Sequence, residues 1–305
     1  MYFLTPILIE DVEFFISNID YISKQWCIHV SSNNPPVFYV CLQTGQHEKI
    51  IIDACKQKLE SKDNVILSVT EVLGVSAARN VCLDAIRPLD DDVCMFLDAR
   101  IILTDSFFKA ITSFKNSEQL AMKGEIVFCQ TSVVSEIISS RGDTLNSLIV
   151  NNESNSTTLP MKKLNLIKEC TLSKWVFKKN ILDDLRFNEN FGPGRDTSVK
   201  SAEDVVFLFD FLSKYDFNIV FLSSKYQVFR ENRPIDLSKH LLYAEGHGAI
   251  LRFLLFKSFR NYFFYFVLFF CNSFRFILKG KSGLQVTKKR LLGLTKNIEV
   301  FLCKK

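Results

Sequence analysis

The sequence predicts an α/β fold in which a mixed, mainly parallel sheet is flanked by helices. Three observations lead to this prediction. Short apolar runs alternate along the chain with segments whose apolar residues recur every three to four positions. Asp98 directly follows one apolar run, as expected where the carboxyl ends of parallel strands form a ligand-binding edge. The residues after 250 differ in composition and are expected to form a helical extension.

The N-terminal part of the chain alternates between strand and helix signals. A turn sequence, NNPP at residues 33–36, separates the first two apolar runs, and near-helical spacing follows the second and third. The expected order is strands over 2–9 and 37–42, a helix over 47–62, a strand over 64–69, a helix over 76–86 and a strand over 93–97.

The rest of the body contains elements of the same kinds. Helices are expected over 105–115 and 202–214, and strands over 125–129 and 218–222. Loops are expected where polar residues or glycines cluster, over 151–158 (NNESNSTT) and over 183–200, which contains FGPGR.

The charge of the chain is unevenly distributed. Residues 251–305 hold twelve Lys or Arg and one acid, a net charge of +11, whereas residues 1–250 carry −6. The apolar run YFFYFVLFFC at 262–271 is too short to span a bilayer, which takes about 20 residues. Residues 251–279 are therefore expected to form an amphipathic helix on an anionic membrane surface, the alternative being a core helix. Nucleic acid is not expected as a partner, because the tail is apolar as well as basic.

The cysteines and the first residues of the sequence predict a cytoplasmic location. The nine cysteines form no Cys-x-x-Cys pair and no Cys/His spacing typical of zinc, so reduced thiols are expected. The first residues, MYFLTP, lack the charged region and the cleavage site of a signal peptide.

Residues 74–80, GVSAARN, form the first motif with chemical potential. Gly74 permits a tight turn, and Ser76 is expected to cap the helix that follows. Arg79 can present a fixed cation to a diphosphate. The alternative is a capped core helix with a surface arginine.

Carboxylates mark two further positions. Asp98 can bind a metal or a sugar hydroxyl, and Arg100 can pair with that carboxylate or with phosphate; a structural ion pair in a turn is the alternative. Glu203 and Asp204 open a helix, where the helix dipole alone favours acids, but a pair facing a pocket can supply a general base. His247, between two glycines, can contact phosphate or a metal, or it is structural.

These motifs, in this order, resemble those of the family-2 glycosyltransferases. Each matches a pattern of that family: GVSAARN at 74–80 (G-x-S-x-A-R-N), FLDAR at 96–100 (F-x-D-x-D), RFNENFGPG at 186–194 (F-D-E-x-F-G-x-G), AED at 202–204 (E-D) and YAEGHG at 243–248 (Y-x-x-G-x-G). The last stretch is found in many capsule and lipopolysaccharide members. The resemblance covers roughly residues 37–255.

The resemblance implies a GT-A (Rossmann-like) domain over residues 1–250, with a donor half to about 103 and an acceptor half over 104–250, followed by a basic tail over 251–305. It implies inverting transfer from a nucleotide-diphosphate sugar to a glycan or lipid-linked acceptor in bacterial surface polysaccharide synthesis, by a peripheral protein at the inner face of the cell membrane.

The resemblance also assigns roles to residues. Asp204 is the expected general base, with Glu203 beside it. The expected donor-binding residues are Ser76, Arg79, Asn80, Asp98 and Arg100. The expected acceptor-binding residues are Trp175, Gly192 and Gly194. A divalent metal, Mg²⁺ or Mn²⁺, would have at most Asp98 as a ligand, with His247 as a weaker candidate.

Three departures from the family pattern leave alternatives open. Arg100 stands where the family has a metal-binding acid, residues 41–43 lack the acid that binds uracil, and residues 229–230 lack a late histidine. Either Arg100 and Arg230 replace the metal at the leaving diphosphate, or the chain is a non-catalytic relative that acts as a scaffold or regulator. A nucleotidyltransferase is a third class, but no Gly-rich phosphate loop follows the first strand.

Overall fold

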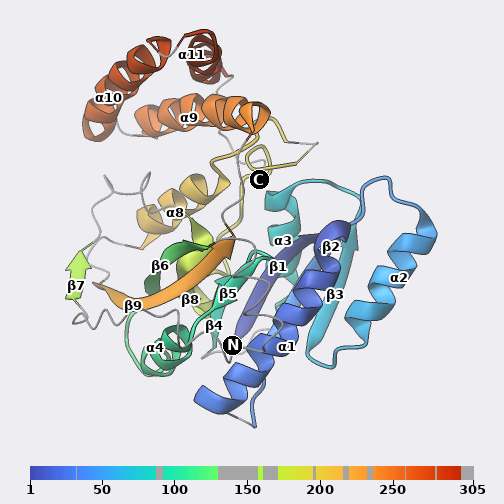
Figure 1. The fold of residues 1–305 in the computed structure, drawn as a ribbon. Coiled ribbons are helices and arrows are strands. Elements are labelled where there is room, and N and C mark those ends of the chain that lie inside the picture. Colours follow the sequence, from blue (N-terminus) through green and yellow to red (C-terminus); the bar gives the residue numbers. More distant parts are fainter. Residues whose placement is uncertain are drawn as a thin grey trace.

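The computed structural model describes residues 1–31, 33–86, 92–129, 157–160, 171–194, 197–215, 220–231, 236–257, 259–278 and 280–296. A nine-stranded sheet runs through the molecule in the order β3-β2-β1-β4-β8-β6-β9-β5, with β7 paired to β9 (Figure 1). Helices cover both faces of this sheet, so the predicted mixed α/β fold is confirmed, although parallel and antiparallel pairings are equally frequent among the described strands.

The N-terminal half of the sheet is parallel. It consists of β1 (Tyr2–Leu8), β2 (Val37–Gln43), β3 (Val65–Thr70) and β4 (Val93–Phe96). The connecting helices are α1 (Val12–His29), α2 (Lys49–Glu60) and α3 (Val75–Ala85). Because the strands are parallel, their carboxyl ends meet at one edge, where ligands bind in such sheets.

The other half of the sheet is mixed. It contains β5 (Ile101–Leu103), β6 (Ala121–Cys129), β7 (Thr157–Pro160), β8 (Trp175–Lys178) and β9 (Val220–Glu231). β8 pairs antiparallel with β4 and β6, whereas β6 and β9 are parallel. The helices of this half are α4 (Asp105–Lys115) and α8 (Glu203–Lys214).

Two apolar cores lie on opposite faces of the sheet. One packs α1 and α4 onto the strands through fully buried aromatic residues that include Phe3, Phe15 and Phe107. The other packs α3, α8 and the start of the C-terminal helices, with Phe96, Phe177 and Phe207 in mutual edge contact. The sheet is thus held from both sides, which fixes the strand ends that carry the site.

Three C-terminal helices, α9 (Leu237–Lys257), α10 (Phe259–Ile277) and α11 (Lys281–Leu294), form a unit at the top of Figure 1. Gly248 and Gly293 let α9 and α11 touch, because a Cβ on Gly248 would lie 2.0 Å from the Arg290 carbonyl oxygen. α9 joins the core of the body through buried residues such as Ile250 and Phe253.

The C-terminal organisation differs from the single helix expected over 251–279. α9 ends at Lys257 and α10 begins at Phe259, and the expected domain boundary at residue 250 falls inside α9. Within the described residues, no helix combines the length and the hydropathy needed to cross a bilayer. The six cysteines with described side chains are all free.

Several other elements differ from expectation. α1, β5 and β8 were not expected, β6 begins earlier and β9 extends further than the sequence indicated. Most of the expected loop over 151–158 lies outside the described residues, and its last two residues belong to β7.

Candidate active site

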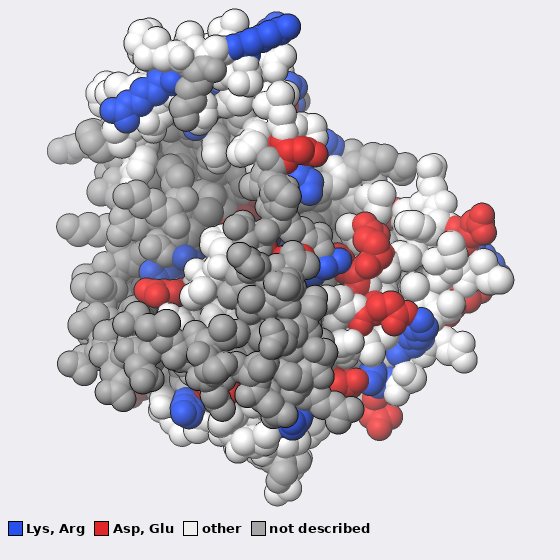
Figure 2. Space-filling model, viewed as in Figure 1, with Lys and Arg blue, Asp and Glu red and all other residues white. Residues whose placement is uncertain are grey.

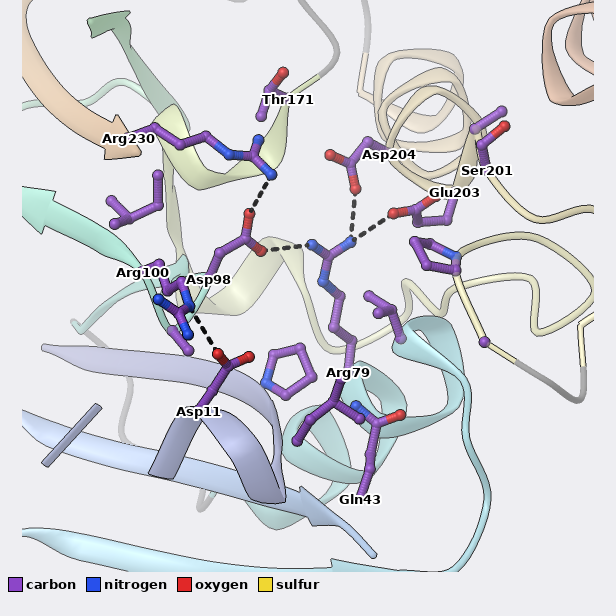
Figure 3. A pocket seen from close by; sticks show the side chains of 18 of the residues that line it. Asp11, Gln43, Arg79, Asp98, Arg100, Thr171, Ser201, Glu203, Asp204 and Arg230 are labelled. Atoms are coloured by element: carbon purple, nitrogen blue, oxygen red, sulfur yellow. Dashed lines mark hydrogen bonds and ion pairs between the residues drawn. The ribbon is translucent and has the colours of Figure 1, made fainter. Parts of the chain in front are cut away.

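A cleft of about 630 Å³ opens at the carboxyl ends of β1, β2 and β4. Besides these strand ends, α3, the loop at 193–194 and the start of α8 meet at the cleft, although they are distant in sequence (Figure 3). The end of β9 completes the lining with Arg230 and Glu231. The cleft therefore lies at the edge that the strand order predicts for ligand binding.

Arg79 is the centre of the cleft's charge network (Figure 3). Its Nη1 donates to Asp204 Oδ1 at 2.6 Å and lies 3.8 Å from Glu203 Oε1. Its Nη2 donates to Asp98 Oδ1 at 3.3 Å. One guanidinium thus binds three carboxylates that come from two different elements.

The surroundings of Arg79 keep this cation fixed. The side chain is 3% exposed, and its guanidinium carbon lies 5.1 Å from the ring centre of Phe187 and 5.9 Å from that of Phe96. Burial alone would lower the pKa of Arg79, but the neighbouring carboxylates, Asp204 first, raise it above the ordinary value. Arg79 is therefore a buried permanent cation, and the alternative of a surface arginine is wrong.

The two carboxylates of α8 have different environments. Asp204 accepts from Arg79 through Oδ1 and from the Leu172 backbone N–H through Oδ2, at 3.0 Å. Glu203 is 12% exposed, and burial raises the pKa of Glu203, with a further increase from the charge of Asp204. Ala202, with φ 74°, turns the chain into the helix so that both acids face the cleft.

A second set of ion pairs lines the opposite side of the cleft. Arg100 donates from Nε to Asp11 Oδ1 at 2.7 Å and from Nη1 to Glu231 Oε2 at 3.3 Å. Arg230 lies with Nη2 3.7 Å from Asp98 Oδ2 and is 42% exposed. Arg100 is thus paired with two acids, whereas Arg230 has a single, longer ion pair among the described residues.

A glycine-containing loop closes against the start of α3. Gly194 has φ 148°, and a Cβ there would lie 2.1 Å from the Leu73 carbonyl oxygen. Gly192 has φ 113° and packs against Ser76 and Glu203. Both glycines are required by this close approach, which packs the loop against residues 73–76 and Glu203. Of the two, Gly194 lines the cleft.

Two of the expected donor-binding residues support this loop instead of lining the cleft. The Ser76 hydroxyl donates to the Phe191 carbonyl at 2.5 Å, and Gly74 is the N-cap of α3, so the expected capping by Ser76 is wrong. Asn80 donates to the Phe187 carbonyl and accepts from the Phe187 N–H. Their side chains hold the loop on which Gly194 is carried.

The structure does not bring Trp175 to the cleft. Its side chain is fully buried in β8 and stacks on Phe177 at 6.0 Å between ring centres. The resemblance placed this residue at the acceptor, and sequence alone cannot tell an apolar strand residue that faces a core from a pocket aromatic.

The residues present do not fit a divalent metal. Among the described residues, no group of three or more His, Cys, Asp or Glu side chains could hold one. Asp98 faces two arginines, and Arg100 contributes no lone pair. His247 lies away from Asp98, in a separate cavity among the C-terminal helices.

Three polar lining residues at the ends of strands were not predicted as site residues from the sequence. Asp11 follows the end of β1, Glu231 ends β9, and Gln43 ends β2. The side-chain Oε1 of Gln43 accepts from the Gly74 N–H at 2.9 Å. All three are polar residues at or just after the end of an apolar strand. The same pattern predicted Asp98 as a site residue, but it was not used for these three positions.

Comparisons with known proteins give a fold relationship. No protein-family model matches the sequence, and no curated protein matches it. The structure is similar to the mannosyltransferase PcManGT from Pyrobaculum calidifontis in complex with GDP-Man and Mn2+, with a TM-score of 0.53 and 12% identity, covering 98% of this chain and 76% of that one.

Two structures of TarS from S. aureus are also similar. TarS 1-349 has a TM-score of 0.49 and 15% identity, covering 82% of this chain and 64% of that one; the longer TarS structure has 0.46 and 17%, covering 80% and 38%. The chain thus spans less than two thirds of either TarS structure. The likeness to the mannosyltransferase shows that this chain has the mixed α/β fold of a glycosyltransferase.

Proposed function

We propose that this chain transfers a sugar from a nucleotide-diphosphate donor to a hydroxyl of a glycan or lipid-linked acceptor, with inversion at the anomeric carbon. The observation that carries the proposal is the convergence of Asp98, Glu203 and Asp204 on Arg79, in a cleft at the carboxyl ends of parallel strands. The motif resemblance and the shared fold with a mannosyltransferase support it.

In this reaction the acceptor oxygen bonds to the anomeric carbon while the bond from that carbon to the phosphate oxygen breaks. The proton of the acceptor hydroxyl passes to a carboxylate, and the nucleoside diphosphate leaves. Asp204 is the proposed base, since its carboxylate faces the cleft at the start of α8 and Arg79 keeps it in place. Glu203, whose pKa is raised, is the neighbouring group that can accept or hold a proton near neutral pH.

The leaving diphosphate needs positive charge, and Arg230 is the group best placed to supply it. It is the more exposed of the two arginines on that side, and its contact with Asp98 is long. Arg100 is bound by Asp11 and Glu231, so we assign it the role of positioning the cleft wall. This assignment refines the hypothesis that both arginines replace a metal.

An anionic membrane surface is the proposed partner of the C-terminal helices. Exposed apolar side chains recur at helical spacing along one face of α10, and they are Phe263, Val267, Phe270, Phe274 and Ile277. Residues 259–296 contain no acid, and Arg275, Lys281 and Lys288 are exposed. Figure 2 shows basic side chains extending from this unit at the top of the view. An apolar face whose charged neighbours on α10 and α11 are all cations matches the chemistry of a bilayer with anionic lipids. This match favours a peripheral location at the inner face of a bacterial membrane, where the proposed role is in surface polysaccharide synthesis.

Calorimetric titration with a panel of nucleoside diphosphates, with and without Mn²⁺, tests the donor site. One nucleotide is expected to bind without metal, and Arg230→Ala is expected to weaken it about tenfold or more, as when a charged hydrogen bond is lost. Arg186→Ala is the matched control, because Arg186 is also 42% exposed and pairs with an Asp outside the cleft. If no nucleotide binds, the donor site is refuted and the non-catalytic scaffold becomes the better account.

A further inference from the structure

A second cavity lies among the three C-terminal helices. It has a volume of about 420 Å³, and we call it the helical pocket. Its lining residues come from α9, from the end of α10 and from α11, and they are Leu237, His240, Tyr243, Ala244, His247, Phe276, Ser282, Gly283, Val286 and Arg290. Tyr243 also lines the cleft, so the two cavities share a wall.

The polar side of the helical pocket carries only cationic or neutral groups. Arg290, His240 and His247 line it, and none of its lining residues is an acid. The nearest acid of α9 along the chain, Glu245, is paired with Lys289 at 3.0 Å and with Lys296 at 2.7 Å. α10 and α11 contain no acid at all. The pocket lining therefore carries positive charge and no acid, and Asp236, which precedes Leu237, is exposed and accepts from the Ser238 hydroxyl and the Lys239 N–H.

Arg290 is held in position without a counter-ion. Its guanidinium carbon lies 4.9 Å from the ring centre of Phe276 and 5.3 Å from that of Phe269, and Nη1 donates to Ser273 Oγ at 3.3 Å. Its Nε is buried and has no hydrogen-bond partner, and no carboxylate of the described residues lies within ion-pair distance of it. Burial lowers the pKa of Arg290, since nothing nearby compensates its charge.

The contrast with Arg79 shows what the helical pocket lacks. Arg79 is buried among three carboxylates, whereas Arg290 is partly buried among aromatic rings with none. A fixed arginine with unused donors, beside two histidines, is suited to bind a phosphate group. Desolvation, and then the charge of Arg290, lower the pKa of His247, so these two groups lie close enough to act on one anion.

The remaining walls of the pocket are apolar. Leu237, Phe276 and Val286 line it, and the next residue after Phe276, Ile277, belongs to the exposed apolar face of α10. A ligand with a phosphate at Arg290 could thus extend an apolar chain toward the surface that is proposed to meet the bilayer.

We propose that the helical pocket binds the phosphate of a membrane amphiphile, a glycosylated alkyl or polyprenyl phosphate, and thereby brings the sugar hydroxyl of this acceptor to the cleft. The proposal rests on the proposed transferase function and names its acceptor class. Tyr243 forms the boundary across which the acceptor hydroxyl reaches Asp204.

Titration of the full chain with dodecyl phosphate below its micelle concentration, with dodecanol and with inorganic phosphate tests this site. Dodecyl phosphate is expected to bind at least about tenfold more tightly than either other probe, because only it uses both walls of the pocket. Arg290→Gln is expected to weaken it about tenfold or more. Lys288→Gln removes the same charge from an exposed position of α11 outside the pocket lining and is expected to have no effect.

Each other outcome has a defined meaning. Equal binding by Arg290→Gln and Lys288→Gln would overturn the proposal, as would dodecanol binding as tightly as dodecyl phosphate. Inorganic phosphate binding equally well would mean a free-phosphate site and no lipid site. Arg290→Lys, which keeps the charge, should retain most of the affinity if Arg290→Gln fails to fold.

Nucleoside diphosphate titrations of the same variants separate this proposal from the donor site. Arg290→Gln is expected to leave nucleotide binding unchanged, because Arg290 does not line the cleft. If dodecyl phosphate binds and no nucleotide does, the transferase proposal fails while the phosphate pocket stands. If a nucleotide binds and dodecyl phosphate does not, the pocket proposal fails alone.

Discussion

Arg79→Met removes the charge on which the three carboxylates of the cleft converge and leaves a side chain of similar length between Phe96 and Phe187. Removing one partner of a buried ion pair costs about 3–5 kcal/mol, because the other charge is left uncompensated. Here Asp98 keeps Arg230 and is 31% exposed, so the lower end, about 3 kcal/mol, is expected.

This loss can be converted into a melting temperature. With an unfolding entropy of about 2.1 cal/mol/K per residue, a chain of 305 residues should lose about 5 °C for 3 kcal/mol. Thermal unfolding followed by circular dichroism measures this loss.

Arg186→Met is the control, because an exposed ion pair contributes about 0–1 kcal/mol. A loss for Arg79→Met as small as that of the control would refute the view that Arg79 neutralises the cleft.

Three further predictions concern acid, backbone and surface. The pKa of Glu203 is raised from 4.5 to about 8, so the stabilisation from this group is present below pH 4.5 and is lost as pH rises to about 8. The melting temperature of Glu203→Gln should therefore exceed that of the wild type by a margin that grows as pH rises through this window. A constant difference between the two melting temperatures would contradict this. Gly194→Ala forces a Cβ to 2.1 Å from the Leu73 carbonyl oxygen and should lower the free energy of unfolding, measured with denaturant, by more than about 1 kcal/mol. Gly280→Ala, also at positive φ but with nothing within 4 Å of the added Cβ, should lower it less. Equal losses would argue against the close approach at Gly194. The double variant Phe270→Ser, Phe274→Ser should bind anionic vesicles more weakly by about 2 kcal/mol, roughly 30-fold, as measured by sedimentation. Ile50→Ser, at an exposed position of α2, should leave vesicle binding unchanged. Unchanged binding of the double variant would exclude the α10 face as the membrane contact.

The sequence predicted the parallel half of the fold well, because its strands are short, continuous apolar runs. α4 was predicted with its observed ends, since Phe107, Phe108, Ile111 and Phe114 form one buried helical face. α1 was missed because buried polar residues interrupt its apolar pattern. One of them, Asn18, donates to the Ile101 carbonyl at 2.8 Å, a partner 83 positions away that no local pattern reveals.

Of the five acids that line the cleft, the sequence predicted Asp98, Glu203 and Asp204, together with Arg79, but not Asp11, Glu231 or the ion pairs. Asp98 was expected in the crevice because it follows an apolar strand, whereas Glu203 and Asp204 were expected there from the motif resemblance. The sequence could not show that Arg79 binds all three, or that Arg100 is bound by Asp11 and Glu231, because these pairs form between segments brought together only by the sheet. Trp175 and Phe276 illustrate the same limit: both are aromatic residues in apolar segments, but the structure buries one in the core and places the other in a pocket.

The most direct test of the transferase proposal is release of nucleoside diphosphate from a panel of nucleotide sugars, in the presence of bacterial membrane lipids, by the wild type and by Asp204→Asn. Melting temperatures of both proteins would establish that the variant is folded under the assay conditions. We expect one donor to be consumed by the wild type, at a rate that falls about 100-fold or more in Asp204→Asn, as when a general base is lost. Equal rates in the two proteins, or consumption of no donor by the wild type, would contradict the assignment of this cleft as a glycosyltransferase active site.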